Sequence, residues 1–203
     1  MNNSVTAHMI VKNEDQFIWY AISSVLPYVD KFIIFDTGST DKTVEIIRLF
    51  KDKKIVFKQK EKVDALGLAA LRNEQIHFTK GGWIWIADGD EAYPQKTVKN
   101  ILGIINGKKD YLGIIVHRYD LLGDIYHYQD EGVGAYNQFG KKGHYVLRLI
   151  NKNKIPGLQV KGEYPNEYYA NRNGQSIKML GKDEFAFVEE RIFHAMYLPR
   201  SSS

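Results

Sequence analysis

The fold that this sequence predicts is decided by the stretch Gly82-Trp83-Ile84-Trp85-Ile86-Ala87-Asp88-Gly89-Asp90-Glu91-Ala92-Tyr93. Residues 83–87 form an uninterrupted apolar run that favours β structure, which indicates a strand buried on both faces in a mostly parallel sheet. The run stops at Asp88 and Asp90, which flank a glycine. Open α/β sheets bind ligands beyond the carboxyl ends of their strands, and Mg²⁺ is usually held by carboxylates together with substrate phosphates. The stretch therefore predicts a site for a metal ion and a diphosphate.

The composition is that of a folded globular protein. The chain has 203 residues, of which 44% are hydrophobic, and this length predicts a single domain over residues 1–203. The net charge of +4 favours anionic ligands such as nucleotides. Because the basic residues are scattered along the chain, nucleic acid is not implied. The abrupt ending at residues 199–203 is compatible with a chain that continues beyond them.

Two absences limit the function further. The chain has no cysteine, which excludes disulfides, thiolate metal sites and cysteine nucleophiles. No apolar run approaches the roughly 20 residues that span a bilayer, and the start of the chain lacks a signal pattern. We therefore expect no transmembrane segment and a cytoplasmic protein.

Apolar periodicity predicts that strands and helices alternate along the chain. The pattern predicts strands at residues 5–11, 31–35, 55–60, 111–119 and 144–150, and helices at residues 16–28, 43–50, 65–78 and 97–105. The glycine-rich residues 123–143 predict a long loop. This alternation predicts an α/β fold, a Rossmann-like three-layer sandwich with a mostly parallel central sheet.

Polar groups follow three of the predicted strands. Asn13 and Glu14 follow the first strand, Asp36 follows the second, and Asp88 and Asp90 follow the central strand. Because parallel strands end at the same edge of a sheet, we expect these groups to lie together. One Asp-x-Asp pair is a weak signal by itself, but three such junctions in order are a much stronger one.

Several of these residues also have a purely structural interpretation. Asp36 has the position of an acid that caps a turn or a helix. Arg72 lies in line with the apolar face of the predicted helix 65–78, so it needs either an internal carboxylate or a phosphate as its partner. His194, which follows Phe193, is either a ligand or a hydrogen-bonded core histidine.

The order of these motifs resembles glycosyltransferase family 2, whose members have the GT-A fold. The resemblance covers roughly the first half of the chain and rests on Met9-Ile10-Val11-Lys12-Asn13-Glu14, Phe35-Asp36-Thr37-Gly38-Ser39-Thr40-Asp41-Lys42-Thr43, Leu71-Arg72-Asn73 and Trp85-Ile86-Ala87-Asp88-Gly89-Asp90-Glu91. The second half resembles the family more faintly, through Arg148-Leu149, residues 162–167, and His194 followed by Arg200. The resemblance as a whole implies a nucleotide-sugar-binding half at residues 1–107 and an acceptor-binding half at residues 108–203.

The resemblance implies a donor site for a nucleotide-diphosphate sugar, most often a UDP-sugar. Asp36 would bind the base, and Glu14 would lie near the ribose. Asp88 would approach the ribose or the metal, and Asp90 would ligate a Mn²⁺ or Mg²⁺ ion that bridges the two phosphates. The other implied groups are His194, as a further metal ligand, and Arg72 and Arg200, as contacts to the diphosphate.

The resemblance also implies an inverting reaction with a carboxylate base in the second half of the chain. The family's usual Glu-Asp and Gln-x-x-Arg-Trp signatures are absent. Glu167 is the preferred base, because it lies where many small bacterial members carry a His-Glu pair, and Glu163 and Asp130 are the alternatives. The loop at residues 123–143 is expected to serve an acceptor whose class is open: a saccharide, a lipid-linked group, a protein or a modified nucleobase.

Two other classes of function compete with a transferase. A non-catalytic nucleotide-sugar or glycan-binding module is one, although the retained acids argue against it. An Asp-x-Asp phosphotransferase is the other, but it would carry its motif on the first strand, whereas Asp88 and Asp90 follow a later one. A Walker-type NTPase is excluded, because the glycine-lysine loop is missing.

Overall fold

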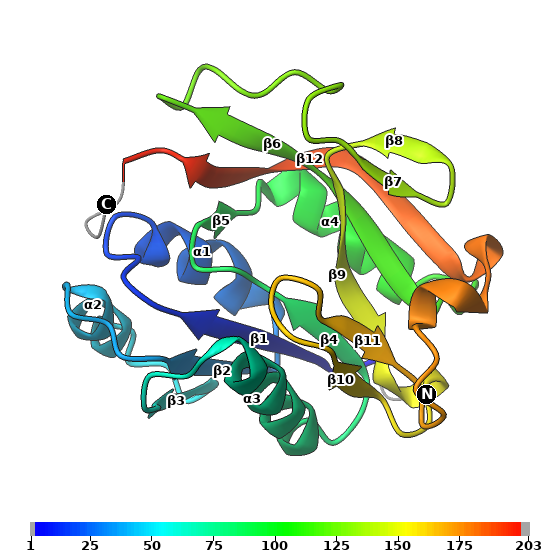
Figure 1. The fold of residues 1–203 in the computed structure, drawn as a ribbon, viewed down its shortest axis with the longest axis horizontal. Coiled ribbons are helices and arrows are strands. Elements are labelled where there is room, and N and C mark those ends of the chain that lie inside the picture. The colour runs from blue at the N-terminus through cyan, green and yellow to red at the C-terminus, as the bar shows by residue number, and fades with distance from the viewer. Residues whose placement is uncertain (1–2, 200–203) are drawn as a thin grey trace.

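A sheet of eight strands runs through the middle of the molecule, whose computed structural model describes residues 3–199. The strands are β1 (Val5–Val11), β2 (Lys31–Asp36), β3 (Ile55–Gln59), β4 (Trp83–Ile86), β5 (Glu91–Ala92), β6 (Gly113–Leu122), β9 (Tyr145–Asn151) and β12 (Phe185–Tyr197). Their order across the sheet is β3-β2-β1-β4-β9-β6-β12-β5 (Figure 1). The central position of β4 agrees with its apolar sequence, because strands in the middle of a covered sheet are buried on both faces.

The sheet is mostly parallel, as predicted. β1 pairs in parallel with β2 and β4, β2 with β3, and β6 with β12. Two strands are reversed: β9 lies antiparallel between β4 and β6, and the short β5 is antiparallel to β12. The direction of these two strands depends on pairings between distant segments, so the local sequence pattern does not encode it.

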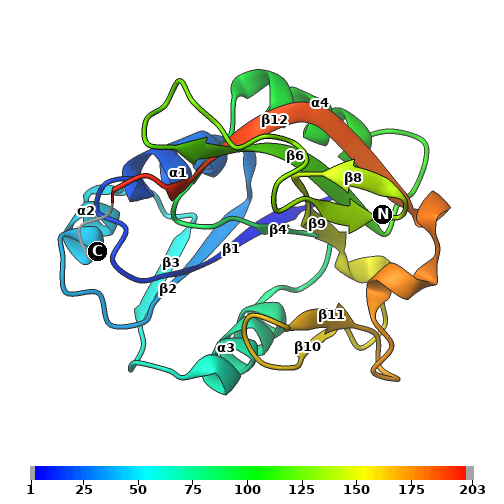
Figure 2. The ribbon, with the colours of Figure 1, turned by 45° about the horizontal axis from the view of Figure 1, so that its top comes forward.

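Helices cover both faces of the sheet and complete the three predicted layers. Helices α1 (Ile18–Val25), α2 (Thr43–Leu49) and α4 (Gln95–Ile105) lie on one face, and α3 (Ala65–Phe78) lies on the other, beside the hairpin of β10 (Gln159–Lys161) and β11 (Tyr168–Ala170) (Figures 1 and 2). Alternate residues of β2 face the two helical layers. Phe32 and Ile34 pack in the same cluster as Ile18 of α1, whereas Ile33 packs with Leu71 of α3.

The core centres on β4. Trp83 and Trp85 are buried in it, as expected for a strand covered on both faces, and Trp85 is 0% exposed. The Trp85 ring contacts the edge of Tyr93 at a centroid distance of 5.1 Å. Truncating a buried aromatic side chain to alanine costs about 3–5 kcal/mol of stability. The strand that carries the predicted site is therefore held firmly in place.

Three predicted elements differ from the structure by more than two residues at an end or in type, and the others agree within two residues. The helix expected at residues 16–28 is an α-helix only over Ile18–Val25 and then continues as the 3₁₀ turn Leu26–Tyr28, because Pro27 has no N–H to donate. The expected loop 123–143 contains the hairpin of β7 (Tyr136–Gln138) and β8 (Lys141–Gly143). This hairpin turns at Phe139 and Gly140, both with positive φ. Finally, β6 continues to Leu122 instead of ending at residue 119.

None of the helices within residues 3–199 has the length and the apolar character needed to cross a bilayer.

Candidate active site

A cavity of about 500 Å³, called the charged cavity below, opens at the edge of the sheet where β1 and β4 end. Both halves of the chain contribute to it. Its polar lining consists of Lys12, Glu14, Arg72, Asp88, Asp90, Arg118, Tyr136, Tyr164 and His194. The acids after the first and central strands therefore meet, as the sequence predicts, whereas Asp36, which was expected to join them, does not line this cavity. Lys12, Arg72 and Arg118 add positive charge to the lining.

Asp88 is held by an arginine from a neighbouring strand. Arg148 of β9 donates a hydrogen bond of 2.7 Å from Nη2 to Asp88 Oδ2 and a second one to Glu91 Oε1. Burial alone would raise the pKa of Asp88, but the guanidinium groups of Arg148 and Arg72 outweigh it and keep that pKa below its usual value. Burial raises the pKa of Glu91 instead. Asp88 therefore faces the cavity as a carboxylate whose orientation Arg148 fixes.

Asp90 lies next to His194, which comes from β12, near the end of the described chain. The two residues meet because β12 runs between β6 and β5, with His194 in register with Glu91 of β5. His194 Nε2 lies 3.4 Å from Asp90 Oδ2, and the N–H of Ala195 donates to the backbone oxygen of Asp90 at 2.9 Å. Asp90 and His194, each predicted as a metal ligand, thus lie in direct contact.

His194 is held from its other side by Asp120, which lies opposite it on β6. His194 Nδ1 donates to Asp120 Oδ1 at 2.6 Å. Burial alone would lower the pKa of His194, but hydrogen bonds to Asp120 and Asp90 raise it to about 9. A metal ion that binds at Nε2 therefore has to displace a proton at neutral pH.

The donor groups present fit a divalent ion, although they do not form a complete site alone. Within residues 3–199, no group of three or more His, Asp or Glu side chains is arranged to hold a metal. Asp88 is engaged by Arg148, which leaves Asp90 and His194 as the pair that faces the cavity together. One carboxylate and one imidazole are suitable ligands when phosphate oxygens and water fill the other positions.

Asp36 and Glu14 lie at the same edge of the sheet as the charged cavity. Asp36 is in register with Val11 of β1, but its buried carboxylate accepts hydrogen bonds of 3.2 Å from the N–H groups of Gly38 and Ser39. It therefore stabilises its own turn, as its structural interpretation predicts. Glu14 is buried and lines the charged cavity.

The carboxylates considered as bases have different surroundings. Glu167 accepts a hydrogen bond of 2.6 Å from Arg72 Nε, so an internal carboxylate is the partner of that arginine. Glu163 is exposed and does not line the charged cavity. The Asp130 side chain is exposed and accepts from the Gly132 N–H at 2.8 Å. Arg200, expected at the diphosphate, lies outside the described residues.

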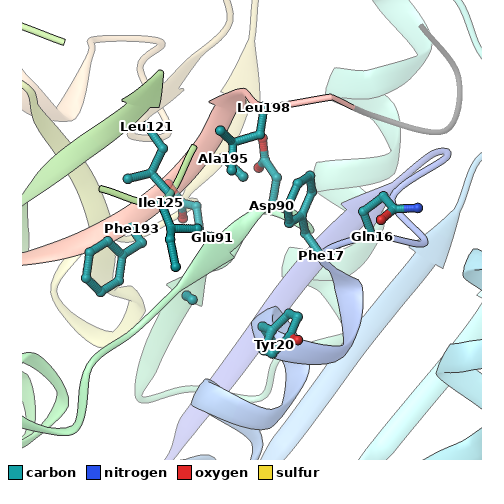
Figure 3. A pocket seen from close by; sticks show the side chains of 11 residues that line it. Gln16, Phe17, Tyr20, Asp90, Glu91, Leu121, Ile125, Phe193, Ala195 and Leu198 are labelled. Atoms are coloured by element: carbon teal, nitrogen blue, oxygen red, sulfur yellow. The ribbon is translucent and has the colours of Figure 1, made fainter. Parts of the chain in front are cut away.

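A second cavity, of about 550 Å³, lies on the other side of β12. Its lining includes Phe193, which precedes His194 and therefore points to the opposite face of the strand. Figure 3 shows Phe17, which immediately precedes α1, and Tyr20 of α1 opposite Leu121 and Phe193 across this space. The lining is largely apolar, so the charged cavity is the one with the chemistry of a diphosphate site.

Sequence reasoning missed two residues that shape the site. Asp120 is not among the predicted site residues, although the Arg118-x-Asp120 spacing places both side chains on one face of a strand. Arg148 belongs to the fainter part of the family resemblance, which does not predict its ion pair with Asp88. A charged residue inside an apolar strand was the signal available for each, because such a residue requires a partner.

Comparison with known structures defines the fold of this chain. The residues 1–349 structure of Staphylococcus aureus TarS covers 95% of this chain and 60% of that chain, with a TM-score of 0.61 and 13% identity. The glucosyl-3-phosphoglycerate synthase of Mycobacterium tuberculosis, in complex with Mn²⁺, UDP and glucosyl-3-phosphoglycerate, covers 96% and 72%, with a TM-score of 0.59 and 17% identity. The fold is therefore that of the GT-A glycosyltransferases.

The chain belongs to glycosyl transferase family 2, whose family model matches residues 6–161. A curated relative, the SPbeta prophage-derived glycosyltransferase SunS of Bacillus subtilis, is 33% identical over 102 residues, which are 50% of this chain and 23% of SunS. A TPR repeat-containing protein of Synechococcus elongatus is 33% identical over 87 residues, 43% of this chain and 20% of that protein. The chain thus spans less than a quarter of these relatives. It contains a glycosyl transferase family 2 domain, as the sequence predicts.

Proposed function

We propose that this domain transfers a sugar from a nucleotide-diphosphate donor, with a UDP-sugar as the favoured donor, to an acceptor hydroxyl with inversion at the anomeric carbon. The charged cavity is the observation that carries this proposal. It is lined by Asp90 and His194 and also by the cationic side chains of Arg72 and Arg118. A nucleoside diphosphate needs both kinds of group, because its charge is balanced by a metal ion and by cations.

The nucleoside is proposed to lie over residues 1–107. A neighbouring cavity of about 340 Å³ shares Lys12 and Tyr164 with the charged cavity and includes Val63 in its lining. An aromatic ring and an apolar side chain suit a flat nucleobase. In this arrangement, Asp36 is the proposed contact to the base and Glu14 the proposed contact to the ribose. UDP in the similar mycobacterial synthase supports the choice of nucleotide.

Asp90 and His194 are proposed to hold Mn²⁺ or Mg²⁺, with Asp88 beside them. When bound, the ion would supply a Lewis acid that stabilises the charge on the departing diphosphate. Arg72 would add a cation on the other side of the diphosphate, and Arg200 is proposed for the same role. The Mn²⁺ and Mg²⁺ complexes of the mycobacterial synthase support a divalent ion.

Glu167 is the proposed base. As the acceptor oxygen bonds to the anomeric carbon, the bond from that carbon to the diphosphate breaks, and the acceptor proton passes to the carboxylate. Arg72 orients Glu167 through Oε1, while Oε2 is buried and has no hydrogen-bond partner among the described residues. The hydroxyl of an acceptor would supply that missing donor. Glu163 is the less favoured alternative, because it is exposed. The acceptor would enter from residues 108–203.

A screen of donors tests this function. The domain is incubated with a panel of UDP- and GDP-sugars and Mn²⁺, with and without saccharide, lipid-linked, peptide and nucleobase acceptors, and the release of nucleoside diphosphate is followed by mass spectrometry. We expect UDP release that stops when EDTA removes the metal. Release that persists after EDTA would contradict the metal role. If GDP-sugars alone react, the choice of UDP is wrong.

A further inference from the structure

Asp120 is a carboxylate next to the charged cavity that contacts three cationic or imidazole side chains, although it does not line the cavity itself. Only 3% of its side chain is exposed. Its Oδ1 accepts from His194 Nδ1 at 2.6 Å, and its Oδ2 accepts from His144 Nδ1 at 2.6 Å. Arg118 adds a third contact, with Nε 2.8 Å from Oδ1. One buried carboxylate therefore joins three side chains.

These contacts fix the orientation of the His194 ring. An ionised carboxylate only accepts hydrogen bonds, so the ring nitrogen that faces Asp120 must carry the proton. That nitrogen is Nδ1, which leaves Nε2 directed towards Asp90, 3.4 Å away. A ring rotated by half a turn would break the 2.6 Å bond and direct a carbon towards the cavity. Asp120 thus selects both the tautomer and the direction of the ring.

The fold maintains this contact. Asp120 and His194 are register partners on the parallel strands β6 and β12. The pairing register shifts between Val188 and Ile192 and again between His194 and Tyr197. In the short stretch between those irregularities, Ile192, Phe193 and His194 pair with consecutive residues of β6. The strand pairing that brings His194 to the cavity therefore also places Asp120 directly beside it.

We infer that Asp120 is a positioning residue that holds the His194 imidazole with Nε2 turned towards a divalent ion in the charged cavity. This inference rests on the proposed function, because it needs an ion at Asp90 and His194. Carboxylates that orient histidine ligands in this way typically change metal affinity by 10–100-fold when they are removed. A role limited to filling the core would leave metal affinity unchanged in any variant that still folds.

The test measures Mn²⁺ binding by electron paramagnetic resonance in the presence of saturating UDP, which does not require turnover. Asp120→Asn keeps the size of the side chain but removes the charge that holds the Nδ1 proton. We expect wild type to bind Mn²⁺ and Asp120→Asn to bind it 10–100-fold more weakly. If Asp120→Asn binds as tightly as wild type, the inference is wrong even though the metal site stands. If wild type binds no Mn²⁺ with UDP, the proposed metal site itself fails.

His144→Leu is the matched control. It removes a hydrogen bond of the same length from the same carboxylate, but it leaves the contact between Asp120 and His194 in place. We expect its Mn²⁺ affinity to stay within about threefold of wild type, while its melting temperature falls. An equal loss of affinity in His144→Leu and Asp120→Asn would show a general disturbance of the core and overturn the positioning role.

A measurement on wild type covers the case in which Asp120→Asn does not fold. Long-range ¹H–¹⁵N correlation of the His194 ring with Mg²⁺ and UDP reports which ring nitrogen carries the proton. We expect a protonated Nδ1 and an Nε2 without hydrogen. The opposite tautomer would overturn the inference.

Discussion

Arg72 of α3 and Glu167, 95 positions later in the chain, form an ion pair with 2.6 Å between Nε and Oε1. Their side chains are only 18% and 12% exposed, so solvent screens this pair less than it screens a surface ion pair. Arg72 also lines the charged cavity. The pair therefore links the proposed donor and acceptor halves next to the site of transfer.

Replacing Glu167 tests the proposed base. Glu167→Gln keeps an oxygen that accepts from Arg72 but removes the group that takes up a proton. Because general-base catalysis typically contributes 10²–10⁴-fold, we expect turnover to fall by at least about 100-fold, with the affinity for UDP and Mn²⁺ unchanged. Steady-state kinetics and calorimetric titration measure the two effects. Glu163→Gln, which alters an exposed acid nearby, is the control and should keep full turnover. The reverse result would move the base to Glu163.

Replacing Arg148 tests how the end of β4 is held. Arg148→Met leaves Glu91, whose side chain is 0% exposed, without its cation. Removing one partner of a buried ion pair costs about 3–5 kcal/mol, and we expect a loss of this size in the free energy of unfolding, measured with urea. Adding Glu91→Gln should recover part of it, because the buried charge is then gone. Additive losses in the double variant would show that the two side chains are not coupled.

Because the His8 ring is buried, we expect the domain to lose stability in mild acid. Burial and, secondarily, the nearby Arg72, Lys152 and Lys31 lower the pKa of His8 to about 3. The native state keeps this ring neutral, whereas the unfolded chain binds a proton below pH 6.5. The neutral His8 ring therefore does not lower the free energy of unfolding above pH 6.5. As the pH falls from 6.5 towards 3, the free energy of unfolding decreases by about 1.4 kcal/mol per pH unit.

A comparison of wild type with His8→Gln isolates this effect. Between pH 7 and pH 5.5, the free energy of unfolding of wild type should fall by about 1 kcal/mol more than that of the variant. Urea unfolding at the two pH values measures both. Equal losses would show that His8 is not buried in its neutral form.

The first half of the fold was predictable because its signals are local. The strand at residues 5–11 and the helix at residues 65–78 have the predicted bounds, since each is marked by its own apolar period and by polar residues at its ends. The position of Asp88 and Asp90 at the edge of the sheet was predictable for the same reason, because these acids interrupt a local apolar run.

The rest of the site depends on pairings between distant strands, which a local pattern does not contain. His194 meets Asp120 only because β12 pairs with β6 in one register, and a shift of one residue would turn it to the other face. Arg148 reaches Asp88 only because β9 lies antiparallel beside β4. The hairpin of β10 and β11, with strands of three residues each, is too short to give a periodic signal.

The central claim is that the charged cavity binds a nucleoside diphosphate through a metal ion at Asp90, and thermal unfolding with UDP and Mn²⁺ tests it most directly. Glu45→Ala, which removes an exposed acid of α2, is the control for a change of charge alone. We predict that UDP with Mn²⁺ raises the melting temperature of wild type and of Glu45→Ala but leaves that of Asp90→Ala unchanged, because a ligand that binds only the native state stabilises it. An Asp90→Ala variant that gains as much as wild type, or a wild type that gains nothing, would contradict the account.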